Sequence, residues 1–534
     1  MTHRQILEAL SGLLLGMFVA ILSSTVVSNA LPRIISELHG TESSYTWVVT
    51  ATLLALTATT PIWGKLADLT SKKMLVQLAL VIYVLGSVLA GLAQTTGELI
   101  ACRAVQGVGA GGLTALAQII LAAMIAPRQR GRYSGYLGAV LALGTIGGPL
   151  IGGVIVDTSW LGWRWCFYVG VPFAVAAIVV LQKTLNLPVV TRKVKIDYLG
   201  ATLIAASVSL LLIWVSLAGN SFAWLAWQTP VMVLGAVALG ALALLVESRA
   251  TEPIIPLHLF RSRTVTLATL ASVAVGVAIY GASVFLGQYF QISRGESPTR
   301  AGLMTLPMIL GLLVASTLTG RLITRTGRWK RYLVSGAVLL TVGFALMGTI
   351  RADTSFPLMS VYMAVLGIGL GMTMQNLVLA VQNTVPVREL GAASSLVAFS
   401  RSLGGAVGVS ALGALLGHRV AGYLADGFGN LGVAAPDSGG AIPNVATLPG
   451  PIRAVVEIAY GHGAGDIFLT AAPFALITLV AVIFIKEVPL RQQSGTDPSG
   501  TGTPGPGGQH RPGTHESGGQ LRPGTATAAP GAVR

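Results

Sequence analysis

The chain has 534 residues, of which 10% are charged and 53% are hydrophobic, and its net charge is +15. A soluble protein carries about 25% charged residues, so a soluble fold of this length is excluded and a membrane protein with many helices is expected. The bases occur in short clusters between apolar runs, which indicates membrane topology rather than a nucleic-acid-binding face.

Spanning helices are the main elements that the sequence predicts. A helix that crosses a bilayer needs roughly 20 mostly apolar residues. Fourteen such stretches follow one another, and they are 6–31, 45–63, 74–95, 99–125, 133–156, 164–182, 198–218, 228–246, 265–290, 301–320, 332–350, 357–383, 391–417 and 467–485. The first stretch is too long for a signal peptide, so we expect an all-α integral membrane protein with fourteen transmembrane helices.

Basic residues predict the orientation of these spans. With both termini in the cytoplasm, 25 of the 34 Lys and Arg fall in cytoplasmic segments, seven fall in outside segments, and Arg103 and Arg401 lie within spans. Cytoplasmic segments of membrane proteins are enriched in bases. The distribution therefore favours cytoplasmic N- and C-termini.

Polar residues near the end of the first span include Ser23, Thr25 and Asn29, in the run Leu22-Ser-Ser-Thr-Val-Val-Ser-Asn-Ala-Leu-Pro32. The second span leads into a loop that begins at Gly64, contains Asp68 and ends in Lys72 and Lys73. A carboxylate such as Asp68 is favoured near the N-terminus of a helix, although the segment also fits a simple positive-inside turn.

A related loop follows the tenth span, from Gly320 to Arg328, and both loops start with glycine, a base and leucine. If the seventh and eighth spans are an insert, the two loops mark a duplicated six-helix unit, which is a known transporter plan. We expect an N-terminal six-helix bundle at 1–184, two inserted spans with cytoplasmic linkers at 185–263, and a C-terminal six-helix bundle at 264–490.

Two segments lack the composition of a packed core. Residues 418–466 are rich in Gly, Ala and Pro and are expected to form a long extracellular loop within the C-terminal bundle. Residues 491–534 are rich in Gly and Pro, and such a segment should be a disordered cytoplasmic tail.

Arg103 lies a few residues inside the fourth span and is followed by Gln106 and Gly107, while Glu98 stands at the outer start of that span. An arginine inside a membrane is costly, so we expect it to face protein or a water-filled cavity. The alternative is that its side chain reaches back to the membrane surface.

The fifth span contains a spaced glycine and proline pattern, G-x-x-x-G-P-x-x-G-G, formed by Gly144, Gly148, Pro149, Gly152 and Gly153. Glycines four residues apart allow two helices to pack closely. A proline removes one backbone hydrogen bond and bends a helix. A packing face explains the glycines but not their joint spacing with the proline.

These motifs resemble those of the fourteen-spanner drug:proton antiporter family of the major facilitator superfamily. Three shorter runs extend the resemblance, namely Trp163-Arg-Trp165, Tyr289-Phe-Gln291 to Ala301-Gly302, and Gln382-Asn383 to Gly404-Gly405. It covers roughly residues 6–486 and implies a major facilitator fold. It also implies that Asp68 bridges the two halves in the outward-facing state, that Arg103 takes part in proton transfer, and that a bend at Pro149 seals one end of the cavity.

The sequence departs from this family in the first span, where Ser23 stands in place of an aspartate. No Asp or Glu lies near the middle of any predicted span, although antiport needs a group that binds and releases protons. Three interpretations stay open: coupling through Arg103 with Glu98, coupling through Asp68, or uncoupled transport.

The expected substrate cavity offers polar groups without charge and some aromatic surface. Its candidate residues are Ser23, Thr25, Asn29, Gln118, Tyr280, Gln288, Gln375 and Asn376. Because a buried cation needs an anionic partner, a cavity without carboxylates fits neutral, zwitterionic or anionic amphiphiles better than simple cations.

We therefore expect a monomeric, multi-pass transporter of a bacterial plasma membrane that exports amphiphilic drugs or antibiotics by alternating access, in exchange for protons. We expect no cofactor, metal or nucleic acid. A dedicated exporter of one endogenous metabolite, such as a self-made antibiotic, fits the same residues. A membrane enzyme or receptor is a distant alternative, because the sequence has no P-loop, no H-E-x-x-H motif and no metal-ligand spacing of histidines.

Overall fold

The computed structural model describes residues 3–39, 42–158, 161–185, 187, 197–218, 222–431 and 448–490, and some side chains within the helices also lie outside this description. Apart from one isolated bridge between Ala218 and Phe222, all regular elements in these ranges are helices. The tail expected at 491–534 lies outside the described residues.

The helices of the first part of the chain are α1 His3–Glu37, α2 Glu42–Leu69, α3 Lys72–Leu92, α4 Thr96–Met124, α5 Pro127–Asp157, α6 Trp165–Tyr168, α7 Val171–Thr184, α8 Tyr198–Leu217 and α9 Gln228–Arg249. Those of the second part are η1 Leu257–Arg261, α10 Arg263–Gln288, η2 Tyr289–Ser293, α11 Pro298–Met304, α12 Leu306–Thr326, α13 Lys330–Met347, α14 Phe356–Thr384, η3 Val387–Glu389, α15 Leu390–Leu431 and α16 Gly450–Phe484.

Thirteen helices among the described residues are long and apolar enough to cross a membrane. They correspond to thirteen of the fourteen predicted stretches. The remaining stretch, 133–156, falls inside α5, which is a helix of 31 residues. The all-helical membrane fold predicted from the sequence is therefore confirmed, whereas a fourteenth span at α5 stays a prediction.

Local side-chain chemistry explains several of the helix ends. The Ser71 hydroxyl accepts a hydrogen bond from the Met74 amide and starts α3, and the Thr95 hydroxyl does the same for Glu98 at the start of α4. Such caps satisfy amide groups that have no partner within the helix. Gly327 ends α12 with a φ of 69°, a left-handed conformation that glycine adopts without strain.

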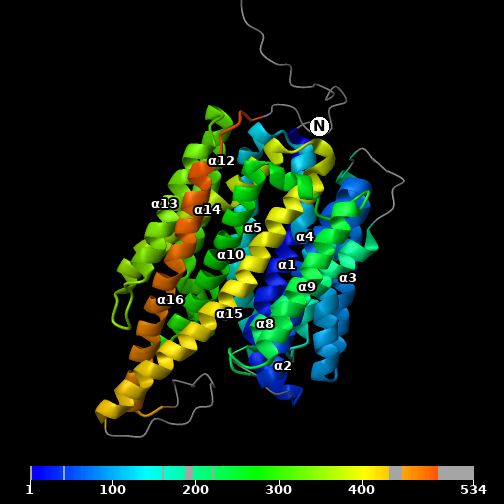
Figure 1. Ribbon diagram of the computed structural model, residues 1–534. Helices are drawn as coiled ribbons and strands as arrows, with labels where there is room; N and C mark the ends of the chain where they lie inside the picture. The colour runs from blue at the N-terminus through cyan, green and yellow to red at the C-terminus, as the bar shows by residue number, and fades with distance from the viewer. Residues whose placement is uncertain are drawn as a thin grey trace, which may run out of the picture. The chain divides into compact units, whose positions relative to one another are not determined.

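The hydrophobic cores separate along the sequence. Two clusters of buried side chains draw on residues between Ile6 and Leu185, and a third draws almost entirely on residues between Leu259 and Leu490. We call these parts of the chain the first half (residues 3–185) and the second half (residues 257–490). Figure 1 shows α13, α14 and α16 of the second half beside one another, in agreement with their contacts.

Helices α8 and α9 pack against each other, and α8 also packs on α2 and α15. Their own cluster of buried residues is extended by Leu54 and Ile62 of α2 and by Phe399 and Leu403 of α15. The opposite side of α9 leaves Leu234 and Val237 66% and 62% exposed. Exposed apolar side chains along a helix long enough to span a membrane suit a face that contacts lipid.

The expectation of a long loop at 418–466 is wrong over most of its length. Helix α15 continues to Leu431 and α16 already begins at Gly450, while residues 432–447 lie outside the described residues. The two extensions pack on each other, since the Tyr423 hydroxyl donates to Asp466 at 2.8 Å. Alanine favours helix, and the alanines of this segment are consistent with the two helical extensions.

Candidate functional site

The two ends of the helix bundle carry most of its polar contacts, and each is named here by one residue. At the Asp68 end, α2, α12 and α14 end while α5, α10 and α15 begin. At the opposite end, the Arg294 end, α10 has just ended and α4 and α14 begin.

Asp68 joins the two halves at its end of the bundle. Its Oδ1 accepts a hydrogen bond from the Gly391 amide at 2.7 Å, and its Oδ2 accepts one from the Ala392 amide at 2.8 Å. Both amides belong to the first turn of α15, where unpaired N–H groups and the helix dipole favour an anion. The carboxylate of α2 thus caps a helix of the other half, and we call this contact the Asp68 joint.

Gly64 lets the two helices come close enough for the Asp68 joint to form. A Cβ atom at Gly64 would lie 2.7 Å from the Gly391 carbonyl oxygen and would collide with the Ser395 hydroxyl. A Cβ atom at Gly391 would in turn meet the Asp68 carboxylate. Gly64 and Asp68 of this loop therefore act together, since the glycine permits the close helix contact in which the aspartate binds the two amides.

The other residues of the loop signatures have different surroundings. Lys73 donates to the Gln182 carbonyl at 2.7 Å and so ties α3 to α7. Lys72 starts α3 and makes no ion pair with Asp68 among the described residues. In the second copy, the Gly320 carbonyl accepts from Thr324 within α12, and the Arg328 amide donates to the Thr326 hydroxyl in the exposed turn.

A charged cavity of about 430 Å³ lies beside the Asp68 joint, between α2, α9, η1, η3 and α15. Lys65 of α2 pairs with Glu252 at 2.6 Å, and His258 of η1 contacts Glu389 of η3 at 3.0 Å. The segment that follows α9 therefore touches both halves. Sequence reasoning did not identify Glu252, His258 or Glu389, because only the fold brings these separated segments together.

A second polar contact crosses between the halves at the Asp68 end. The Arg130 guanidinium of α5 donates to the Gln382 side-chain oxygen at 2.6 Å and to the Ala122 and Ile125 carbonyls at 2.7 and 2.8 Å. The Gln382 amide of α14 in turn donates to Ser394 at 2.9 Å. Arg130 and Gln382 are both buried, so this contact and the Asp68 joint close the halves against each other at this end.

Arg103 lies inside the first half, where it is 3% exposed. Its Nη1 donates to the Gln106 oxygen at 2.5 Å, and the Gln106 amide donates to Ser87 at 2.7 Å and to Ser23 at 3.3 Å. Ser23, at the position of the missing aspartate, is thus linked to Arg103 through one glutamine. This places Arg103 against protein and excludes the alternative that it reaches back to the membrane surface.

Glu98 is not brought to Arg103. It is exposed, and its Oε2 accepts a hydrogen bond from the Gln94 amide at 2.8 Å. Its own amide donates to the Thr95 hydroxyl at 3.2 Å. These two bonds form a reciprocal cap at the start of α4, and no ion pair with Arg103 occurs among the described residues.

The spaced glycines of α5 face α1. A Cβ atom at Gly144 would lie 2.7 Å from Ile21, one at Gly152 would lie 3.2 Å from the Val26 carbonyl oxygen, and one at Gly148 would collide with Thr25. The Thr25 hydroxyl donates to the Gly144 carbonyl at 3.0 Å. The side chain of Pro149 and the surroundings of Gly153 lie outside the described residues.

The other residues expected in a substrate cavity are distributed over α4, α10 and α14. Gln118 is buried, Tyr280 lies against Gly405, and Asn376 donates to the Met372 carbonyl at 2.6 Å. Gln375 is partly buried. The side-chain oxygen of Gln288 is buried and has no hydrogen-bond partner among the described residues. The side chain of Asn29 lies outside the described residues. None of them lines the cavities at the two ends, so their role in binding stays a prediction.

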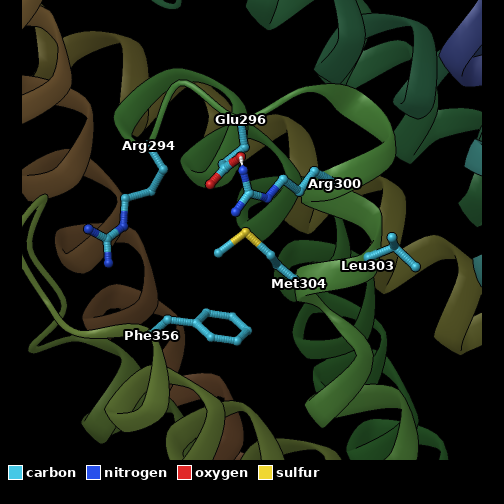
Figure 2. A pocket seen from close by; sticks show the side chains of 6 residues that line it. All are labelled: Arg294, Glu296, Arg300, Leu303, Met304 and Phe356. Carbon is cyan, nitrogen blue, oxygen red and sulfur yellow. Dashed lines mark ion pairs between the residues drawn. The ribbon is translucent and has the colours of Figure 1, made fainter.

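A pocket of about 610 Å³ lies at the Arg294 end, and Figure 2 shows the six side chains that line it. Phe356, Met304 and Leu303 provide its apolar surface. Arg300 pairs with Glu296 at 3.2 Å, whereas Arg294 donates to the Ala352 and Thr354 carbonyls. The pocket therefore combines apolar walls with a net positive charge.

No group of three or more His, Cys, Asp or Glu within the described ranges could hold a metal ion.

Comparison with known proteins gives consistent results. A model of the Major Facilitator Superfamily matches residues 13–409. An uncharacterized MFS-type transporter of Mycobacterium tuberculosis is 38% identical over 486 residues, which are 90% of this chain and 69% of that protein. The multidrug transporter protein MdtP of Bacillus subtilis is 35% identical over 422 residues, which are 78% of this chain and 76% of that protein.

Among solved structures, the human organic anion transporter MFSD10 has a TM-score of 0.60 and is 14% identical. The similarity covers 89% of this chain and 99% of that structure. At this level of identity the likeness shows the fold alone.

Proposed function

The chain belongs to the Major Facilitator Superfamily, a family of membrane transporters and not of enzymes, and on this premise we propose that it exports amphiphilic drugs or antibiotics across a bacterial plasma membrane. In this proposal the Asp68 end faces the cytoplasm, as the distribution of bases predicts. Cargo enters there and leaves at the Arg294 end. The chain works as one of the fourteen-spanner drug:proton antiporters.

The Asp68 joint is the observation that carries this proposal. Alternating access requires contacts between the halves that close one end at a time and then separate. The Asp68 joint consists of two hydrogen bonds at the crossing of two glycines, and the Arg130–Gln382 contact lies at the same end. Such contacts are strong enough to hold one state and few enough to be exchanged for another.

Export, rather than import, is supported by the relatives and by α5. Relatives at 30–35% identity are named as multidrug transporters or as multidrug resistance proteins. Helix α5 packs closely on α1 through Gly144, Gly148 and Gly152. These glycines belong to the glycine and proline pattern that resembles the drug:proton antiporters. We infer that this contact lets α1 and α5 move as a unit when the halves separate.

For proton coupling we propose Asp68 and Arg103 as the principal residues, with Glu98 in the role of a helix cap. Asp68 is the carboxylate whose partners change when the halves separate, so its affinity for a proton can differ between the two states. Arg103 lies in a network of neutral side chains. A change in its contacts would therefore alter the electrostatic potential inside the first half.

The test is transport by the full chain in proteoliposomes under an imposed pH gradient, with wild type compared with Arg103→Ala and Asp68→Asn. Export that follows the gradient in wild type and loses this dependence in either variant supports the proposal. Lys183→Gln, at an exposed position of α7, serves as a control for the loss of one charge. Transport that ignores the gradient in wild type would refute proton coupling, and no transport of any amphiphile would refute the function.

Dedicated export of one endogenous metabolite is the second candidate. It differs from broad drug efflux only in the range of cargo. A panel of unrelated amphiphiles, tested for resistance when the chain is expressed, separates the two, because a dedicated exporter protects against one compound and its close analogues.

A further inference from the structure

We propose that the preferred cargo of this transporter is an amphiphilic anion, attracted by two arginines within the spans, Arg103 of α4 and Arg401 of α15, which form no ion pair among the described residues. The inference rests on the exporter function proposed above and specifies the charge of its cargo.

Arg103 carries an uncompensated positive charge in the first half. Its hydrogen-bonded neighbours among the described residues are neutral, since it donates to Gln106, which continues to Ser87 and Ser23. Its Nε is buried with no hydrogen-bond partner in the described part of the chain. Arginine stays protonated in proteins, and it lies roughly 10 Å along α4 from the first residue of that helix.

Arg401 places a second positive charge in the other half. It is partly buried and lies roughly 16 Å along α15 from Leu390, well inside the span. Its backbone packs directly on α10, because a Cβ atom at Gly276 would collide with the Arg401 carbonyl. None of the ion pairs found among the described residues includes Arg401.

The carboxylates of the described residues that form ion pairs all lie at the two ends of the bundle. Glu252 and Glu389 pair at the Asp68 end, and Glu296, Asp466 and Glu457 pair at the Arg294 end. The sequence adds no Asp or Glu near the middle of any span. Arg103 and Arg401 are therefore positive charges within the spans that have no ion-pair partner among the described residues.

A fixed positive charge in a medium of low dielectric constant selects the sign of what approaches it. At a separation of about 8 Å and an effective dielectric constant of about 20, one unit charge changes the affinity for a unit anion by about 30-fold (~2 kcal/mol). A cation of the same size is disfavoured to a similar extent. The effect acts through space, so the cargo does not need to touch either guanidinium.

The pocket at the Arg294 end also favours an anion over a cation. Arg294 is held by carbonyl groups and not by a carboxylate, and Arg300 shares its charge with Glu296 (Figure 2). The apolar faces of Phe356, Met304 and Leu303 suit the hydrophobic part of an amphiphile. A volume of about 610 Å³ lies within the range of small-molecule sites.

The experiment uses two probes that differ only in charge, 11-(dansylamino)undecanoic acid and the matching dansylaminoundecyl trimethylammonium ion. Binding to the full chain in phosphatidylcholine nanodiscs is followed by dansyl fluorescence, with empty nanodiscs subtracted. We expect wild type to bind the carboxylate at least tenfold more tightly than the ammonium. Ser23→Asp, which places a carboxylate next to Gln106, should reduce this ratio at least tenfold, whereas the neutral Ser23→Asn should preserve it.

Arg401→Gln is an independent test that leaves the Arg103 network intact, and it should also reduce the ratio. Lys183→Gln, at an exposed position of α7, removes a charge at the surface and should leave the ratio unchanged. Equal binding of the two probes by wild type, or equal effects of Ser23→Asp and Ser23→Asn, would overturn anion selection. In proteoliposomes with the same full chain, export of the ammonium probe alone would overturn anion selection while leaving the exporter function intact, whereas a folded chain that exports no amphiphile at all would refute both.

Discussion

Asp68→Asn is the substitution that most directly tests how the Asp68 end is held closed. Asparagine has nearly the same shape as aspartate but offers one acceptor oxygen and no charge. In the structure both carboxylate oxygens accept from backbone amides of α15, at 2.7 and 2.8 Å. The variant therefore keeps one of these bonds and turns an amide donor towards the other N–H group.

The expected loss of stability of the closed Asp68 end follows from the number and type of hydrogen bonds that Asp68 makes. A hydrogen bond to a charged group contributes about 1.5–3 kcal/mol, and a negative charge at a helix N-terminus contributes about 0.3–1 kcal/mol. Losing one such bond together with the charge should destabilise the closed Asp68 end by about 2–4 kcal/mol relative to the open one. This corresponds to a shift of about 30- to 700-fold in the equilibrium between the two states.

Distances between spin labels measure this shift. Gln129 at the start of α5 and Arg325 at the end of α12 are exposed positions in opposite halves at the Asp68 end, so Gln129→Cys and Arg325→Cys can carry the labels once Cys102 and Cys166 are replaced by Ala. We expect a single short distance in the parent chain and a longer distance in Asp68→Asn. Asp466→Asn, a matched change at the other end, should keep the short distance.

An Asp68→Asn variant with the distance distribution of the parent chain would refute this account of the joint. So would an equal change in Asp466→Asn, because the effect would then reflect a general loss of stability. A drop in thermal stability without any change in the distance would likewise show that Asp68 supports the fold and not the closed state.

Three further predictions follow from single contacts. Gly148→Ala should lower the free energy of unfolding by about 1–3 kcal/mol, because its methyl group meets Thr25. Its thermal midpoint should fall below that of Gly97→Ala, where nothing lies within 4 Å. Lys65→Met and Glu252→Gln should show a coupling of about 1 kcal/mol in a double-mutant cycle for closure of the Asp68 end, and additive effects would contradict a role of the α9 segment. Glu98→Ala should cost about 0.5–2 kcal/mol of stability as a lost cap while leaving the pH dependence of transport unchanged, and a lost pH dependence would restore Glu98 as a coupling residue.

Much of the fold could be predicted from the sequence, because the bilayer imposes a strong and local constraint. A helix must satisfy its own backbone in lipid and must be apolar over its whole length, so each span is recognisable from its own residues. The same reasoning gave a wrong prediction at 418–466, where a loop was expected and helices extend. Apolarity reports where the membrane ends and not where a helix ends, and the extensions of α15 and α16 are stabilised by each other.

Some residues of the candidate site could likewise be predicted from the sequence, and others could not. The sequence identified Gly64, Asp68 and the glycines of α5. These residues act where two helices approach closely, and such contacts leave a recognisable spacing of residues along the chain. Glu252, His258 and the Arg130–Gln382 contact give no such signal, since each is an ordinary polar residue until a distant segment faces it. Composition and hydropathy were therefore enough to predict a bundle of membrane helices. Which helix end Asp68 caps, and the neutrality of the network around Arg103, were decided by tertiary structure alone, because both depend on contacts between segments up to 324 residues apart.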